Sequence, residues 1–147
     1  MVNGPVFGSK DLFSGLAIIA DTYSNHNGPH NHNHPYLSAM VNNGSLSYDH
    51  DRDGTHTMLG GCEVKFRNME HETLIAIRYE GDKLTVSHDL SNRRAWEPCF
   101  SIGMLYRFID RLRDKVLFQM VLYFQQDTIL EFLLLLETSV IITMLLV

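Results

Sequence analysis

The chain has 147 residues, of which 45% are hydrophobic and 20% are charged, so one globular domain with a buried core is expected. Its formal net charge of -5 argues against binding to nucleic acid, because phosphate binding requires clustered Lys and Arg that displace counterions. The basic cluster at 107–115 is interrupted by Asp110 and Asp114, and we expect it to be the solvated face of a helix.

The first segment, residues 1–13, has neither a basic region nor an apolar run, so the chain as written is expected to lack a signal peptide. The two cysteines, Cys62 and Cys99, fit either one disulfide in an oxidising compartment or two buried thiols in the cytosol. Neither cysteine lies in a C-x-x-C motif or near a Cys/His quartet. A structural zinc site or a redox pair built on them is therefore disfavoured.

Residues 16–89 have the spacing of antiparallel β-structure, with short apolar runs separated by turn residues. The runs at 37–41 and 45–48 flank Asn42-Asn43-Gly44, and Asn-Gly supplies the positive φ angles of a tight turn, so they predict a hairpin. A second hairpin is predicted at 73–79 and 83–88, around Glu80-Gly81-Asp82. Between the first two runs, 24–35 is a polar loop that cannot bury a core.

The pattern changes at about residue 102, where the turn residues disappear. Apolar residues recur at the spacing of an amphipathic helix at Leu105, Phe108, Ile109, Leu112 and Val116. The following segment, 116–147, is almost continuously apolar. Its last part, 132–147, is short for a membrane span and carries Glu137, so a weak tail anchor and a buried or aggregation-prone helix are both open interpretations.

Two polar loops carry oxygen ligands suited to a hard cation. Asp21, the Tyr23 carbonyl and Asn25 follow a predicted strand and could supply half of a calcium shell, while the acidic loop 49–54 could complete it. Ordinary solvated turns are the alternative for both loops. The second loop imitates an EF-hand opening, but its twelfth position is Gly60 where a bidentate Glu is required.

Other constellations are weaker. Four histidines in one loop could ligate zinc or nickel, although we expect a variable polar loop there: His26, His30, His32 and His34. No nucleophile elbow, zinc-protease helix or phosphate loop occurs, and the Glu70 and Glu72 pair is expected to face solvent, so we predict no enzymatic activity. Asn43-Gly44-Ser45 is an N-glycosylation acceptor.

Three longer strings add a family resemblance, namely GPVFGSKDLFSGLAIIADTYSN, PYLSAMVNNGSLSYDHDRDG and GGCEVKFRN. Between Gly4 and Cys99 the chain resembles the vesicular integral-membrane L-type lectins, which are cargo receptors of the endoplasmic reticulum, intermediate compartment and Golgi. It is less similar to the related intermediate-compartment lectin. The resemblance implies a concanavalin-like antiparallel β-sandwich that binds high-mannose glycans through Ca²⁺.

The same resemblance assigns residues to the site. The calcium ligands would be Asp21, the Tyr23 carbonyl, Asn25 and Asp53, while Asn25 and His50 would hydrogen-bond mannose hydroxyls. Calcium would then hold the Asn25 amide in place for the sugar. By resemblance too, Cys62 and Cys99 match a disulfide of the family and Asn43 matches a glycosylation site.

The chain also departs from the family pattern. We expect a partial lectin domain at 4–102, lacking upstream strands with a sugar-binding aspartate and a downstream glycine-aspartate-leucine loop. Residues 103–147 match nothing in the family and are predicted to be an apolar helical tail. The expected function is calcium-dependent sorting of high-mannose glycoproteins on the luminal side of endoplasmic reticulum and Golgi membranes, with membrane association in full-length members. The alternatives are a membrane-associated fragment without sugar binding and a metal-binding module built on the histidine tract.

Overall fold

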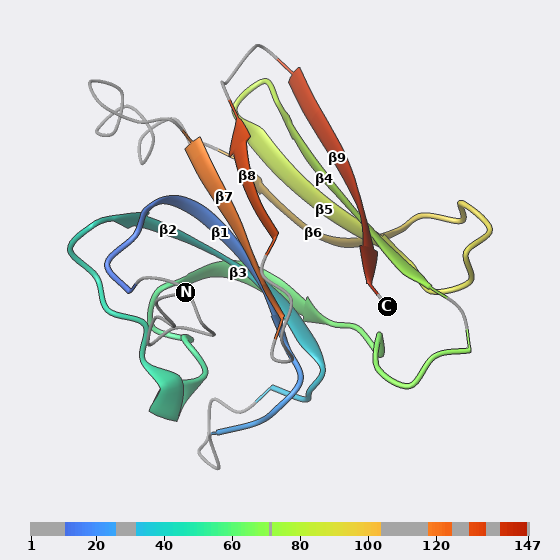
Figure 1. The fold of residues 1–147 in the computed structure, drawn as a ribbon, viewed down its shortest axis with the longest axis horizontal. Coiled ribbons are helices and arrows are strands. Elements are labelled where there is room, and N and C mark those ends of the chain that lie inside the picture. The colour runs from blue at the N-terminus through green and yellow to red at the C-terminus, as the bar shows by residue number, and fades with distance from the viewer. Residues whose placement is uncertain are drawn as a thin grey trace.

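The computed structural model describes residues 11–25, 32–70 and 72–103, and the backbone of three further strands at 118–124, 130–134 and 139–146. The described strands form two β-sheets, drawn in Figure 1. In chain order they are β1 (Ser14–Asp21), β2 (Tyr36–Asn43), the short 3-10 helix η1 (His50–Arg52), β3 (Met58–Glu63), β4 (Thr73–Glu80), β5 (Lys83–Asp89), β6 (Glu97–Gly103), β7 (Phe118–Phe124), β8 (Leu130–Leu134) and β9 (Ser139–Leu146).

One sheet has the strand order β3-β2-β1-β7-β8, and the other has the order β6-β5-β4-β9. The β1 and β7 strands pair in parallel, and every other strand pair described is antiparallel. The expected all-β class is therefore confirmed, with one parallel pair that the expectation did not include. The two sheets pack against each other, as in a sandwich.

The core lies between the sheets and follows the two-residue period of the strands. On β1, the alternate residues Leu16 and Ile18 face the second sheet, while Ala17 and Ile19 face away from it. The buried residues of the core between the sheets are Leu16, Ile18, Ala20, Leu37, Ala39, Val64, Ile75, Ile77, Leu84 and Val86. A second cluster covers the outer face of β1 and β2 and consists of Phe13, Ala17, Ile19, Met40 and Tyr48. Both faces of β1 are thus buried, which explains its continuous apolar sequence.

One predicted hairpin is confirmed and the other is wrong. The β4 and β5 strands pair around Gly81 and Asp82, whose φ angles of 55° and 62° are those of a tight hairpin turn. Residues 45–48 form no strand, because the Asn42 side chain accepts hydrogen bonds from the amides of Gly44 and Leu46 and donates to the Leu46 carbonyl. This local network holds 44–46 in a loop, and β2 pairs with β1 and β3 instead.

The expected helical tail is corrected where the structure describes it. In the apolar segment the described elements are strands, and β7 pairs with β1 while β9 pairs with β4. These pairings satisfy backbone groups that β1 and β4 would otherwise expose along open edges. The β-branched and aromatic residues of the segment also favour strands. The predicted amphipathic helix at 105–116 lies outside the described residues, and among those described no helix is long and apolar enough to cross a membrane.

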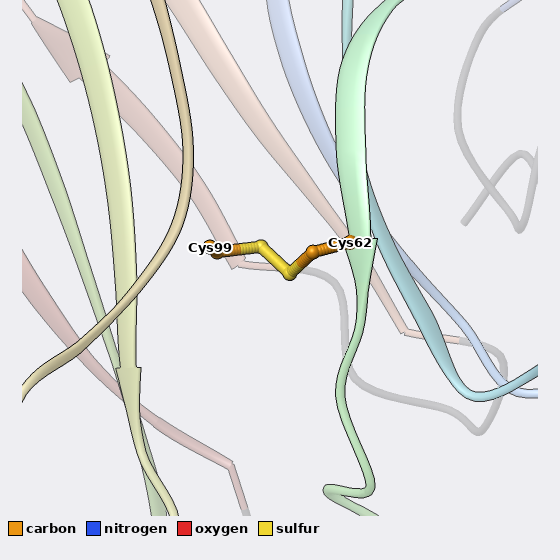
Figure 2. Close-up of a disulfide and its surroundings, with 2 residues drawn as sticks. All are labelled: Cys62 and Cys99. Carbon is orange, nitrogen blue, oxygen red and sulfur yellow. A yellow bond between two sulfur atoms is a disulfide. The ribbon is translucent and has the colours of Figure 1, made fainter.

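A disulfide joins the two sheets. Figure 2 shows Cys62 on β3 bonded to Cys99 on β6, with their Cα atoms 5.4 Å apart. The bond closes a loop with a sequence separation of 37 residues. Chain-entropy reasoning gives about 3 to 4 kcal/mol of stabilisation for a loop of this size, because the bond restricts the unfolded chain.

Candidate cation site

The first half of the candidate site lies at the end of β1. Asp21 is the last residue of this strand and is 4% exposed. Its carboxylate accepts a hydrogen bond from the Tyr23 amide, with 3.0 Å between nitrogen and Oδ1, and this contact turns the chain as it leaves the sheet. The Tyr23 side chain points into solvent, with 61% of the residue exposed.

The second half is the loop that contains η1. Asp53 follows the helix with a φ of 48°, and its amide donates to the His50 carbonyl at 3.1 Å. The Asp53 side chain is 1% exposed. Its neighbour Gly54 has a φ of 66° and lies so close to the Tyr48 ring that a Cβ atom there would come within 2.3 Å of it. Only glycine fits this position, and the close contact fixes where Asp53 sits.

A hydrogen bond ties the two loops together. The backbone N–H of Asn25 donates to Asp53 Oδ1 at 2.9 Å, across 28 residues of sequence. The predicted ligands Asp21, Asn25 and Asp53 are thus brought to one place. This tertiary contact and the burial of Asp21 and Asp53 distinguish the two loops from ordinary solvated turns.

The electrostatics of the site are unfavourable without a cation. Burial raises the pKa of the Asp21 carboxyl, and the negative charge of Asp53 raises it further. Burial and then the charges of Asp21 and Asp53 also raise the pKa of the Tyr48 hydroxyl well above its usual range. Asp53 Oδ2 is buried and has no hydrogen-bond partner. Two buried carboxylates and an unpaired carboxylate oxygen are a donor set that fits a hard divalent cation.

The other predicted residues fall in different places. His50 lies on η1, and its ring stands edge-on to the Tyr48 ring with 4.9 Å between centroids. Asn43 is exposed at the end of β2, where its side chain accepts hydrogen bonds from the Ser45 amide and hydroxyl. Glu70 and Glu72 are exposed, as expected for a solvent-facing pair.

One histidine of this site could not be recognised from the sequence pattern. His34 lies in the tract that we expected to be a variable polar loop, yet its side chain is 6% exposed. Its Nε2 atom lies 3.6 Å from Asp21 Oδ2 and 3.9 Å from Asp53 Oδ2. The position follows from strand register, since Asp21 pairs with Tyr36 and His34 lies just before it. His26 and His30 lie outside the described residues.

Two facing sheets, with buried carboxylates on neighbouring loops at the end of one strand, define a β-sandwich protein with an acidic loop site. A family model described as the legume-like lectin family matches residues 1–106. The chain belongs to the legume-like lectin family.

Known proteins resemble part of the chain. It is 53% identical over 102 residues to the vesicular integral-membrane protein VIP36 of Canis lupus familiaris, a match that covers 69% of this chain and 28% of that protein. Protein ERGIC-53 of Homo sapiens is 38% identical over 85 residues, covering 58% of this chain and 16% of that protein. The chain thus spans less than a third of the length of these relatives.

Solved structures of the VIP36 exoplasmic/lumenal domain resemble the same part. The form bound to Ca²⁺ and Man2 has a TM-score of 0.66 and 52% identity, and the match covers 70% of this chain and 41% of that one. The metal-free form also has a TM-score of 0.66 and 52% identity, covering 70% and 43%. The likeness therefore includes both the fold and the sequence.

Proposed function

We propose that this chain is a calcium-dependent lectin that binds mannose-rich glycans. The observation that carries the proposal is the pair of buried carboxylates, Asp21 and Asp53, held together by the Asn25 amide with one carboxylate oxygen unpaired. A Ca²⁺ ion would neutralise both charges and satisfy that oxygen. The known structures of the VIP36 domain with Ca²⁺ and with Man2 or Man3GlcNAc support the same assignment.

The proposed calcium ligands are Asp21, the Tyr23 carbonyl, Asn25 and Asp53. When bound, the ion supplies positive charge and fixes the ligands in place. Asn25 and His50 would then hydrogen-bond mannose hydroxyls, and the Tyr48 ring supports the His50 imidazole from one side. Since Asn25 is exposed, its side chain can reach a sugar from solvent. Pre-positioned polar groups of this kind provide specificity for a ligand that offers mainly hydroxyls.

The proposed setting is the luminal side of endoplasmic reticulum and Golgi membranes. There the chain would take part in sorting high-mannose glycoproteins, with residues 4–102 as the lectin portion and Asn43 as a glycosylation site. The disulfide between Cys62 and Cys99 is consistent with an oxidising compartment. The relatives named as vesicular integral-membrane proteins support membrane association of the complete protein.

Two matched variants test the proposal. Asp53→Asn should lose mannose binding in calcium, because it removes a buried charge that the ion requires. Asp51→Asn changes an exposed acid of the same loop and should bind like the unmodified chain. Binding is measured on immobilised mannose oligosaccharides, and folding is checked by circular dichroism. Equal mannose binding by Asp53→Asn and the unmodified chain would refute the assigned site.

A further inference from the structure

A second metal-binding arrangement lies beside the proposed calcium ligands. The His34 imidazole is buried, and neither ring nitrogen has a hydrogen-bond partner. Its Nε2 atom lies 3.6 Å and 3.9 Å from the nearest oxygens of Asp21 and Asp53, distances too long for hydrogen bonds. A buried polar group without a hydrogen-bond partner costs about 1–3 kcal/mol, and a ligand bound here would remove that cost.

A second imidazole completes the group. The His32 ring centroid lies 4.7 Å from that of His34. One ligand atom each from His32, His34 and Asp53 lie within 4.8 Å of one another. The Asp53 oxygen nearest His34 is Oδ2, which is buried without a hydrogen-bond partner, whereas Oδ1 accepts the Asn25 amide. One donor atom of each side chain therefore lies close to a donor atom of the other two.

The segment that carries both histidines is anchored to β3. The Asn33 amide and side chain donate to Glu63 Oε1 at 3.3 Å and 2.9 Å. The His32 ring lies against the Tyr36 ring, with 3.7 Å between centroids. Tyr36 in turn packs over Gly61, where a Cβ atom would come within 2.4 Å of the ring. These contacts hold the histidines in position, which a solvated polar loop would not do.

The chemistry of the three ligands identifies the ion. Two imidazoles and one carboxylate suit a borderline transition-metal ion such as Zn²⁺, whereas Ca²⁺ is bound through oxygen. Zinc with three protein ligands of this type takes a fourth position from water. Bonds of about 2.0–2.1 Å place tetrahedral ligands about 3.3 Å apart, so the donor atoms would need to close by about 1.5 Å at most. A bound ion would draw the donor atoms together by this distance.

We propose that His32, His34 and Asp53 form a zinc-class site next to the proposed calcium site. The proposal does not require the chain to bind calcium or sugar, although Asp53 belongs to both ligand sets. The site uses the end of the histidine tract that the structure describes, together with a carboxylate from a distant loop. It therefore differs from nonspecific binding of zinc by a histidine-rich segment.

The test is a calorimetric titration of ZnCl₂ into the full chain, first stripped of calcium. One zinc ion should bind per chain, and His34→Asn and Asp53→Asn should each weaken the affinity at least tenfold. His32→Asn should weaken zinc affinity to the same extent. Because His32 is only half-buried, this variant tests the proposal even if His34→Asn fails to fold. Excess Mg²⁺ should not displace the zinc.

Two controls separate this site from the remaining histidines. His56→Asn changes an exposed histidine outside the group and should leave zinc affinity within twofold of the unmodified chain. The double variant His26→Asn/His30→Asn should do the same. Loss of zinc binding in that double variant, or unchanged affinity in His32→Asn, would overturn the proposal. Zinc binding in a chain that fails to bind mannose would refute the lectin function and leave this site standing.

Discussion

At the scale of single residues, the cation site places two buried carboxylates close together. Asp21 and Asp53 are both buried, and burial together with their mutual repulsion raises the pKa of Asp21. A carboxyl whose pKa is raised in the folded state stabilises the fold at low pH, and this contribution is lost as the pH rises through the folded pKa. Ionisation of Asp21 therefore destabilises the metal-free fold as the pH rises, and a bound cation would reverse this effect.

The first prediction concerns Asp21→Asn. In chelator at pH 7, this variant should melt about 3 °C higher than the unmodified chain, which corresponds to about 1 kcal/mol, because an amide carries no charge to bury. Calcium should raise the melting temperature of the unmodified chain but not of the variant, since a ligand at 100 times its Kd adds about 2.7 kcal/mol. Scanning calorimetry measures both. A variant that melts lower in chelator would contradict the charge argument.

The second prediction concerns Gly54, which contacts the Tyr48 ring. Gly54→Ala should lower the free energy of unfolding by about 1–3 kcal/mol, because the added Cβ overlaps the ring and the φ of 66° disfavours alanine. Gly81→Ala is the matched control, since Gly81 has a φ of 55° and open space around its Cβ position. Urea denaturation compares the two. Equal losses would show that the Tyr48 contact contributes nothing beyond the backbone conformation.

The site was predictable from sequence only in part. Asp21, Asn25 and Asp53 could be nominated because their spacing and the family strings single them out. His34 could not, because its approach to Asp21 depends on the register that pairs Asp21 with Tyr36 across β1 and β2. Local patterns identify ligand types, whereas strand pairing decides which distant side chains share a site.

At the scale of elements, local side-chain hydrogen bonds decide where strands end. Asp89 is the last residue of β5, and its carboxylate accepts hydrogen bonds from the Ser91 hydroxyl at 2.7 Å, the Ser91 amide at 2.8 Å and the Arg94 amide at 2.6 Å. The hydrogen bond from the Ser91 hydroxyl has the largest effect, and together with the bonds from the two amides it lowers the pKa of Asp89 below its usual value. The loop between β5 and β6 is thus organised by one carboxylate.

The third prediction follows from the lowered pKa of Asp89. A carboxyl with a lowered folded pKa contributes stability above its unfolded pKa, and the contribution is lost as the pH falls through the folded pKa. Asp89→Asn should therefore melt at a lower temperature than the unmodified chain at pH 7, and the difference should shrink below about pH 4. Thermal unfolding from pH 3 to 7 measures this, with exposed Asp51→Asn as the control. A pH-independent difference would contradict the assigned role of the charge.

The two predicted hairpins show how far strand pairing can be predicted from sequence. The turn at Gly81 and Asp82 was predictable because the apolar runs on both sides alternate, and the structure pairs them as β4 and β5. The Asn-Gly signal after β2 was equally strong as a turn. No strand follows the Asn-Gly turn directly, because the Asn42 side chain holds the next residues in a loop. The strand that pairs antiparallel with β2 is β3, which begins only at Met58.

The fourth prediction tests the pairing of β9 with β4. Every second amide of an antiparallel edge strand points to its partner, so the double variant Ile142→Pro/Thr143→Pro must remove a ladder hydrogen bond. Hydrogen exchange of the β4 amides that point toward β9 should become at least tenfold faster. The β2 amides, which pair with β1 and β3, should exchange at an unchanged rate and serve as an internal control. Unchanged exchange in β4 would argue against the strand and return the tail to the helical interpretation.

At the scale of the whole molecule, the strands of the apolar segment extend both sheets. The β7 strand joins the sheet that carries Asp21, and β9 joins the sheet opposite. Composition could not reveal this, because a continuous apolar run suits a buried helix as well as a buried strand and only the partner edges decide between them. The disulfide between Cys62 and Cys99 then ties the sheets together at β3 and β6. The two loops of the cation site thus rest on one sheet that is braced by the other.

The most direct test of the account is binding of the purified full chain to a high-mannose oligosaccharide, measured in calcium and again after a chelator is added. If the two loops form a calcium-dependent sugar site, the chain should bind in calcium, lose binding in chelator and regain it when calcium is restored. Soluble, folded protein that fails to bind in calcium, or binds equally well in chelator, would contradict the claim that the two loops form a calcium-dependent sugar site.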